Sequence, residues 1–230
     1  MKTISVIYEN DEIILVNKEA GVSVQGGAGI AHPLDEELPK QLGCKIHLVH
    51  RLDKETAGIL IVAKNPSAAA KWTKLIQTEQ VQKVYSAVCF GIPQMKGKPV
   101  MEGKLSGTVE AHGRTQNAEL FFKVEKKWTE KIISENAETG ERTEKNLDLS
   151  LVKITLGTGR MHQIRIQMAK SSAPLAGDDK HGNFKLNKLA RKAGIKRLQL
   201  AATKLTIPVD GKPKTFEIPL PEHFKNPCEV

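Results

Sequence analysis

The sequence predicts a single mixed α+β domain over residues 1–230. Strand-like runs rich in apolar and β-branched residues alternate with stretches of helical periodicity, and neither an internal repeat nor a Gly/Pro/Ser-rich linker divides the chain. Its 230 residues, 40% of them hydrophobic, suffice for a sizeable core, so the composition argues against a largely disordered chain.

Two strands and a tight turn open the chain. Residues 4–9 and 12–18 are β-rich, and Asn10-Asp11 between them has turn chemistry, which predicts a hairpin. The glycine-rich residues 26–29 lack the Gly-Lys-Ser/Thr that completes a phosphate-binding P-loop, so we interpret them as a flexible loop.

A polar loop separates two further strands. Residues 46–49 and 58–63 have strand patterns, and the five apolar residues 59–63 indicate burial on both faces. Between them, residues 50–56 form a charged loop on a rigid support. A helix then begins at Asn65-Pro66. The apolar face of that helix carries Ala69, Trp72, Leu75 and Ile76.

The second half of the chain predicts more strands and one helix. A turn at 157–159 precedes helical spacing that extends from Met161 through residue 170, and Thr158 or Gly159 is expected to cap that helix. Residues 130–145 are polar and indicate an exposed hairpin or loop. The predicted strands are 83–90, 118–125, 147–156, 198–202 and 215–218.

The charge balance favours a polyanionic partner. The 35 Lys and Arg residues exceed the 26 acidic ones by nine, and the isoelectric point is near 9.4. Three cysteines, Cys44, Cys89 and Cys228, are too few for a disulfide framework and suit a reducing compartment. Neither a secretory signal nor an apolar run of the ~20 residues that cross a bilayer is present. We expect a cytoplasmic monomer without membrane association.

Two patterns that suggest bound ions or nucleotides have simpler explanations. Cys44, His47 and His50 have spacing reminiscent of a zinc site, but side chains alternate along a strand, so His47 points away from the other two. Gly157-Thr158-Gly159 begins like a dinucleotide fingerprint, yet His162 occupies the place of the third glycine. We therefore predict no metal and no nucleotide cofactor.

Four segments together resemble a known family. Residues 50–60 (HRLDKETAGIL) closely resemble the active-site motif of the RluA-type pseudouridine synthases. Three more segments resemble further blocks of that family in the same order: 83–87 (KVYSA), 159–165 (GRMHQIR) and 174–178 (PLAGD) followed by Gly182. The chain starts directly in the catalytic pattern, so we expect it to lack the small N-terminal RNA-binding domain of many relatives.

The resemblance implies a fold and a reaction. The fold would be a largely antiparallel sheet with flanking helices and loops around a central catalytic cleft. The reaction would isomerise uridines of structured ribosomal or transfer RNA to pseudouridine without metal or cofactor. The sequence names neither the RNA nor the uridine. Six positions depart from the family pattern: Glu19, Ala57, Met161, Gln167, His181 and Ala201.

The resemblance also implies the catalytic residues. Asp53 would be the carboxylate that acts on the sugar or base, either by attack on ribose C1′ or by promoting elimination. Arg165 would hold that carboxylate ionised and oriented. Tyr85 would stack on the turned-out base and assist proton removal from C5.

Further residues of the same motifs are expected to contact RNA. Arg51 would fill the space that the turned-out base leaves in the stack, or bind a phosphate. The other expected RNA contacts are His50, Lys83, Arg160 and His162.

Two other functions remain open at this point. A non-catalytic RNA-binding protein would explain the charge, although an Asp in the middle of a basic loop would weaken phosphate binding. A nucleoside or glycoside hydrolase would use two carboxylates about 5–10 Å apart, such as Asp53 with Glu55 or Asp178.

Overall fold

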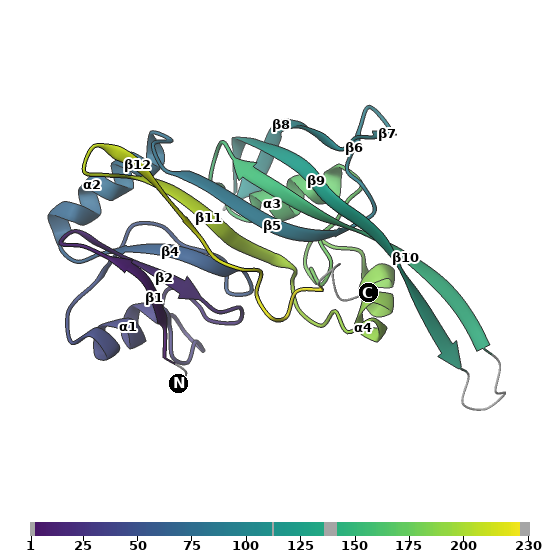
Figure 1. Ribbon diagram of the computed structural model, residues 1–230, viewed down its shortest axis with the longest axis horizontal. Helices are drawn as coiled ribbons and strands as arrows, with labels where there is room; N and C mark the ends of the chain where they lie inside the picture. Colours follow the sequence, from purple (N-terminus) through teal and green to yellow (C-terminus); the bar gives the residue numbers. More distant parts are fainter. Residues whose placement is uncertain (1–2, 112, 136–141, 226–230) are drawn as a thin grey trace. The chain divides into compact units, whose positions relative to one another are not determined.

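A computed structural model describes residues 3–111, 113–135 and 142–225 (Figure 1). The chain divides into two compact units, one of residues 1–85 with 200–221 and the other of residues 86–199 with 222–230. Both units mix helices and strands, which confirms the predicted α+β class. The single domain over residues 1–230 stays a prediction.

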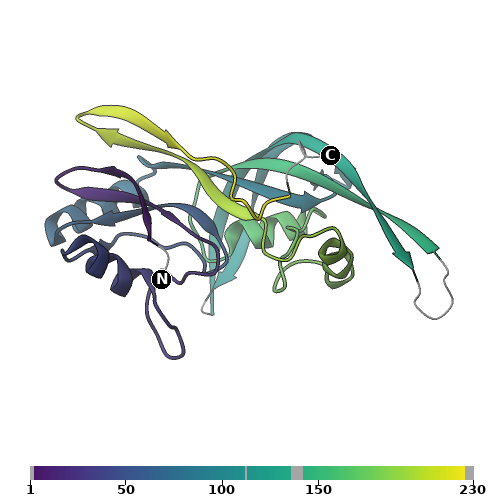
Figure 2. The same ribbon diagram turned by 60° about the horizontal axis from the view of Figure 1, so that its bottom comes forward.

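The first unit is built on a sheet with β4 near its middle. β2 pairs with β1 and β4 in antiparallel fashion, β4 and β11 are parallel, and β12 extends β11 as a hairpin (Figure 2). The short β3 pairs with the end of β4. The strands are β1 (Ser5–Glu9), β2 (Ile13–Lys18), β3 (His47–Leu48), β4 (Ala57–Ala63), β11 (Leu200–Val209) and β12 (Lys212–Glu217).

Local turn and cap chemistry acts as predicted in this unit. Asn10 Oδ1 accepts hydrogen bonds from the backbone N–H groups of Glu12 and Ile13, which closes the predicted hairpin. Asn65 caps α2 (Pro66–Gln77) by accepting from the Ala68 N–H. All seven residues of β4 are buried, as the apolar run predicts.

A helix that the sequence did not predict, α1 (Leu34–Leu42), precedes β3. It has no side-chain N-cap and contains Pro39, so the usual start signal is missing and a breaker lies inside. It ends at Gly43, which adopts the left-handed conformation.

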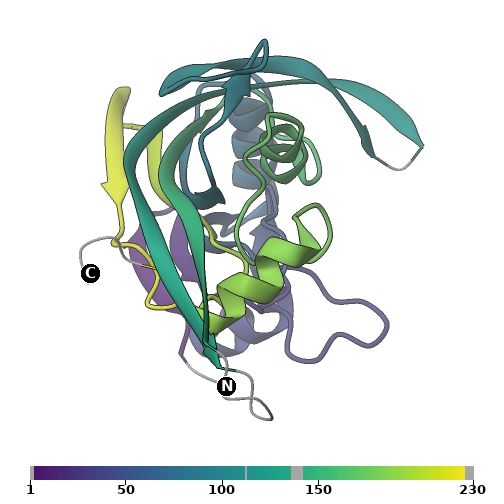
Figure 3. The ribbon, with the colours of Figure 1, turned by 90° about the vertical axis from the view of Figure 1, so that its right-hand side faces the viewer.

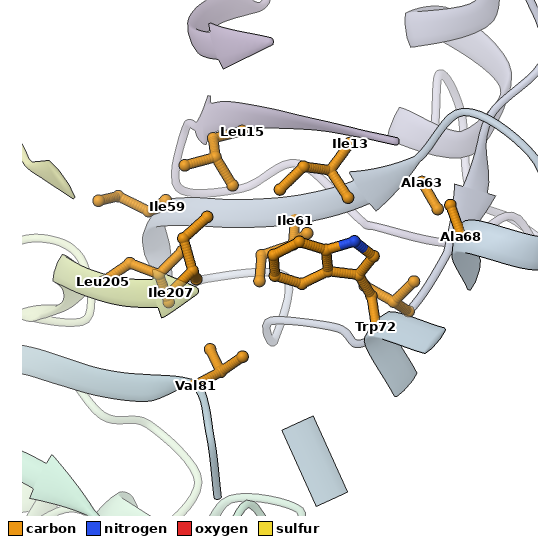
Figure 4. Packing of buried hydrophobic residues seen from close by; sticks show 11 residues of the cluster. Ile13, Leu15, Ile59, Ile61, Ala63, Ala68, Trp72, Val81, Leu205 and Ile207 are labelled. Atoms are coloured by element: carbon orange, nitrogen blue, oxygen red, sulfur yellow. The ribbon is translucent and has the colours of Figure 1, made fainter. Parts of the chain in front are cut away.

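The core of the first unit surrounds Trp72 of α2 (Figure 4). The indole is 2% exposed and packs beside Ile13 and Ile61 of the sheet. Its Nε1 donates to Glu12 Oε2 at 2.9 Å, so the one polar atom of this buried ring has a partner. The core fixes α2 on the sheet and thereby supports the ends of β3 and β4.

The second unit contains a curved run of strands in which β9 pairs with both β8 and β10 in antiparallel fashion. Figure 3 shows its strands curving over α3 (Gln163–Lys170) and α4 (Phe184–Lys192). The strand order is β5-β10-β9-β8, and a small separate hairpin joins β6 and β7. The strands are β5 (Gln82–Phe90), β6 (Gln94–Met95), β7 (Lys98–Pro99), β8 (Glu102–Ala111), β9 (Arg114–Glu135) and β10 (Arg142–Leu156).

The elements of this unit are longer or more numerous than the sequence predicted. The predicted strand at 118–125 is part of a 22-residue β9, which pairs with β10 out to Arg142↔Glu135. This confirms a hairpin at 130–145 except for residues 136–141, which lie outside the described part. Neither β8 nor α4 was predicted, because their sequences are mostly polar.

No helix among the described residues is long and apolar enough to span a bilayer. Cys44 is exposed and Cys89 is buried, and both are free thiols. The third cysteine, Cys228, lies outside the described residues.

Gly58 of β4 lies tightly against the backbone of β11. It pairs with Ala202 in parallel register and has φ +114, and a Cβ there would overlap the Ala202 carbonyl oxygen. Gly43, also at positive φ (+68), has nothing within 4 Å of such a Cβ. An alanine at Gly43 would therefore introduce backbone strain alone, whereas an alanine at Gly58 would add a steric overlap to that strain.

We expect Gly58→Ala to lower the free energy of unfolding by more than about 3 kcal/mol, because backbone atoms cannot move aside as a side chain would. Gly43→Ala should cost only about 1–2 kcal/mol, the strain of a left-handed residue. Denaturant titration of both variants measures the difference, and equal losses would contradict the overlap.

Candidate active site

Asp53 lies in a loop whose two ends are fixed by strand pairing. The loop, residues 50–56, begins after β3 and ends where β4 starts. Its backbone turns because Thr56 N–H donates to the Asp53 carbonyl at 3.1 Å. Leu52 and Thr56 are buried, at 5% and 2% exposure, while Asp53 between them is half-buried. The structure therefore confirms a loop on a rigid support.

A buried lysine fastens this loop to its neighbour. Lys18 ends β2 and is 1% exposed. Its Nζ donates to the carbonyl oxygens of Glu19, Val22 and Lys54 at 3.1, 2.8 and 3.1 Å. Burial lowers the pKa of Lys18 to about 8, while the charges of Glu55 and Asp53 raise it, so the ammonium group persists at neutral pH.

Sequence reasoning missed Lys18, although the signal was present. Side chains alternate along a strand, so Lys18 shares a face with Ile14 and Val16. Both of these are fully buried. A lysine at the end of a buried face must find acceptors, and the loop carbonyls supply them.

His50 serves as a backbone partner. Its Nε2 accepts the Ile61 N–H at 3.0 Å, on the part of the β4 edge between the β11 and β3 pairings. Burial and the charge of Lys83 lower the pKa of His50 to about 3, so the ring is neutral. The expected RNA contact of His50 stays a prediction.

Tyr85 lies within the electrostatic reach of Asp53. Tyr85 is 7% exposed. Its burial, and to a smaller extent the negative charge of Asp53, raises the pKa of the phenol above the usual value. Lys83, two residues earlier on the same face of β5, is half-buried, and burial lowers the pKa of its ammonium group. The first unit thus gathers an acid, a phenol and a lysine, and Arg51 is exposed in the same loop as the acid.

In the second unit, Arg165 forms a buried ion pair with Asp178. Its Nε and Nη2 donate to Oδ2 and Oδ1 of Asp178 at 2.9 and 2.7 Å, the paired geometry typical of Arg and carboxylate. The two side chains are 11% and 1% exposed. Burial alone would raise the pKa of Asp178, but hydrogen bonds from Arg165 and from the backbone of Lys180 and His181 lower it, with a net decrease.

Asn187 of α4 connects this ion pair to the helix. Its Nδ2 donates to the Asp178 carbonyl at 2.9 Å, and its Oδ1 accepts the Gly177 N–H at 2.9 Å. Since the Asp178 carboxylate holds Arg165 and two backbone N–H groups, it is a structural anion. That weakens its candidacy as the second carboxylate of a hydrolase.

The turn before α3 is held by Gln163, a correction to the expected cap. The N-cap of α3 is His162, with φ 52 and no side-chain cap bond, so neither Thr158 nor Gly159 caps the helix. Thr158 Oγ1 donates instead to Gln163 Oε1 at 2.7 Å, and Gln163 Nε2 donates to the Glu119 carbonyl at 2.8 Å. The turn is therefore fastened to β9.

The remaining predicted RNA contacts lie around that turn. Arg160 is exposed, and its Nε donates to the Asn117 carbonyl at 3.2 Å. His162 Nδ1 and His181 Nε2 are 2.8 Å apart, close enough that one ring must donate to the other. Burial, then the charge of Arg165, lowers the pKa of His181, which favours a neutral ring in this pair.

The predicted site residues divide between the two units. His50, Arg51, Asp53, Lys83 and Tyr85 belong to the first, and Arg160, His162 and Arg165 to the second. The pairing of Arg165 with Asp53 stays a prediction. Within the described residues, no three His, Cys, Asp or Glu side chains gather as a metal site would require.

Comparisons with known proteins agree on one family. Residues 12–170 match the RNA pseudouridylate synthase family. Proteins named ribosomal large subunit pseudouridine synthase C are 34% identical in Rickettsia felis, over 95% of this chain and 68% of that protein, and 30% identical in Buchnera aphidicola, over 96% and 69%.

Solved structures have the same fold. The human RNA pseudouridylate synthase domain containing 1 superposes with a TM-score of 0.68 at 21% identity, over 95% of this chain and 84% of that one. The human domain containing 4 gives 0.69 at 23% identity, over 95% and 89%. Together with the matched residues and the similar sequences, these likenesses show that the chain belongs to the RNA pseudouridylate synthase family and is an isomerase of RNA uridines.

Proposed function

We propose that this enzyme converts uridines of large-subunit ribosomal RNA to pseudouridine, with Asp53 as the catalytic carboxylate. The placement of Asp53 carries the proposal: it lies half-buried in a loop fastened by Lys18, near enough to buried Tyr85 for its charge to raise the pKa of the phenol. The names of the similar bacterial proteins support ribosomal RNA, and transfer RNA is the alternative substrate.

The reaction conserves all atoms of the nucleotide. The bond from N1 of uracil to ribose C1′ breaks, the base turns, and C5 bonds to C1′; C5 loses a proton and N1 gains one. An ionised Asp53 serves either as the nucleophile at C1′ or as the base that starts elimination from the sugar. A uridine within folded RNA must first be turned out of its stack.

Tyr85 takes part as a neutral phenol. Its raised pKa keeps the proton on the hydroxyl at neutral pH, so removal of the C5 proton would pass through the hydroxyl oxygen as a relay. The ring face would stack on the uracil. We also propose that Arg51, Lys83, Arg160, His162 and His50 contact RNA, and that the enzyme is a cytoplasmic monomer.

Asp53→Asn is expected to abolish pseudouridine formation, because the amide keeps the shape but not the charge or the nucleophile. Folding and RNA affinity should stay near those of the wild type. The assay is pseudouridine in a large-subunit ribosomal RNA transcript. Activity of even a tenth of the wild type, equivalent to about 1.4 kcal/mol of barrier, would remove Asp53 from its role. Free uracil as the wild-type product would indicate a hydrolase instead.

Tyr85→Phe is expected to slow the chemical step by about 10²–10⁴-fold with little change in RNA affinity, because the ring still stacks while the proton relay is lost. Single-turnover rates at saturating RNA measure this. A rate within threefold of the wild type would leave Tyr85 with stacking alone.

Arg165→Ala is expected to reduce the single-turnover rate far more than RNA affinity, because its guanidinium pairs with the Asp178 carboxylate and is proposed to orient Asp53 rather than to bind phosphate. It should also cost about 3–5 kcal/mol of stability, since Asp178 becomes a buried unpaired charge. Arg165→Lys keeps the charge without the paired donors, so it separates folding from catalysis. Equal losses of affinity and rate would mark Arg165 as a phosphate contact.

A further inference from the structure

The segment around α4 is unusually basic and lies outside the motif residues assigned to catalysis. Residues 180–197 contain seven Lys or Arg and no Asp or Glu, against a net charge of +9 for the whole chain. The seven are Lys180, Lys185, Lys188, Arg191, Lys192, Lys196 and Arg197, and all are exposed.

Helical periodicity gathers three of these lysines on one face of α4. Lys185, Lys188 and Lys192 are spaced i, i+3 and i+7, opposite the buried Asn187 and Ala190. Lys185 and Lys188 have no acidic partner in the described part of the chain. The neighbouring acids are occupied: Asp178 by Arg165, and Asp179 by Arg191 at 2.9 Å.

An exposed aromatic ring stands at the start of this face. Phe184, the first residue of α4, is 77% exposed, more than any other large apolar side chain in the described residues. Asn183 fixes the helix start by accepting the Leu186 N–H at 3.1 Å, so the backbone of Phe184 is held in the first turn. Lys188 is one helical turn away from Phe184.

Exposed aromatic rings beside basic groups suit unpaired nucleic acid. Bases stack on the ring, and the cations bind the phosphates. From Lys185 to Lys192 the helix rises about 10 Å, the length of roughly three stacked nucleotides.

We propose that the face formed by Phe184, Lys185, Lys188 and Lys192, here called the α4 face, binds an unpaired segment of the substrate RNA. The lysines would contact successive phosphates, and the Phe184 ring would stack on an exposed base. The inference rests on the proposed function, which supplies RNA as the partner.

The α4 face is linked to the catalytic residues of its unit. On the opposite side of the helix, Asn187 bonds to the backbone of Gly177 and Asp178, and Asp178 holds Arg165. RNA bound to the α4 face is therefore held at a defined place relative to Arg165. The face contributes affinity and leaves the chemical step unchanged.

The test combines two variants with matched controls. Lys185→Gln with Lys188→Gln removes two charges from the face, and Lys45→Gln with Lys98→Gln removes two exposed charges elsewhere. Phe184→Ala removes the ring, and Phe184→Tyr keeps it. The probe is a labelled synthetic stem-loop, with an unpaired flank, copied from the ribosomal RNA site that the wild type modifies. Dissociation constants are measured at several salt concentrations.

The double lysine variant should bind about tenfold more weakly at 0.1 M salt, with the slope of log affinity against log salt reduced by about 1.4–1.8. Phe184→Ala should weaken binding at least about fivefold with an unchanged slope, and Phe184→Tyr should bind normally. Rates at saturating RNA should equal the wild-type rate in all four.

Binding by both face variants equal to that of the control pair would overturn the proposal, whatever the activity. Failure of the proposed function looks different: the wild type itself would form no pseudouridine in ribosomal RNA.

Discussion

The ammonium group of Lys18 joins the two loops on which the first unit's part of the site depends. A buried charge is costly unless its hydrogen bonds are made, and here three backbone carbonyls from residues 19, 22 and 54 satisfy it. The Lys54 carbonyl also accepts the Gly21 N–H at 2.8 Å, so two hydrogen bonds join the Asp53 loop to the segment that follows β2. Because Lys54 follows Asp53 directly, a group at the end of a buried strand fixes the backbone beside the carboxylate.

The second unit uses a different solution for the same problem. Its cation and anion, Arg165 and Asp178, are both buried and satisfy each other, with two backbone N–H groups completing the carboxylate. Such a pair gains little stability over apolar packing but fixes geometry, because either partner alone would be a buried charge. Gln163 adds to this by tying the turn before α3 to β9. The Asp178 carboxylate thus sets the orientation of the Arg165 guanidinium.

Local chemistry explains what the sequence could predict. The Asn10 turn, the Asn65 cap and the buried run of β4 are decided by neighbouring residues, and all three are confirmed. The motif that contains Asp53 resembles that of a known family, and the similar proteins show that the chain belongs to this family. The catalytic role of Asp53 stays a prediction. By contrast, α1 and the ion pair between Arg165 and Asp178 depend on residues distant in the sequence, so the local pattern did not predict them. The sequence also did not predict His162 as the N-cap of α3, because its side chain makes no cap bond. The turn is held instead by Gln163, whose Oε1 accepts the Arg160 N–H.

Two departures from the family pattern meet in the sheet beside the Asp53 loop. Ala57, where Ser is usual, pairs directly with Ala201, where His is often found, and both are nearly inaccessible at 2% and 0% exposure. A buried Ser or His needs hydrogen-bond partners, whereas two alanines need none, so this pair packs without any polar side-chain atom. The next pair, Gly58 and Ala202, is the close approach of these strands, which leaves little room for larger groups. Apolar packing alone therefore supports the start of β4, where the Asp53 loop ends.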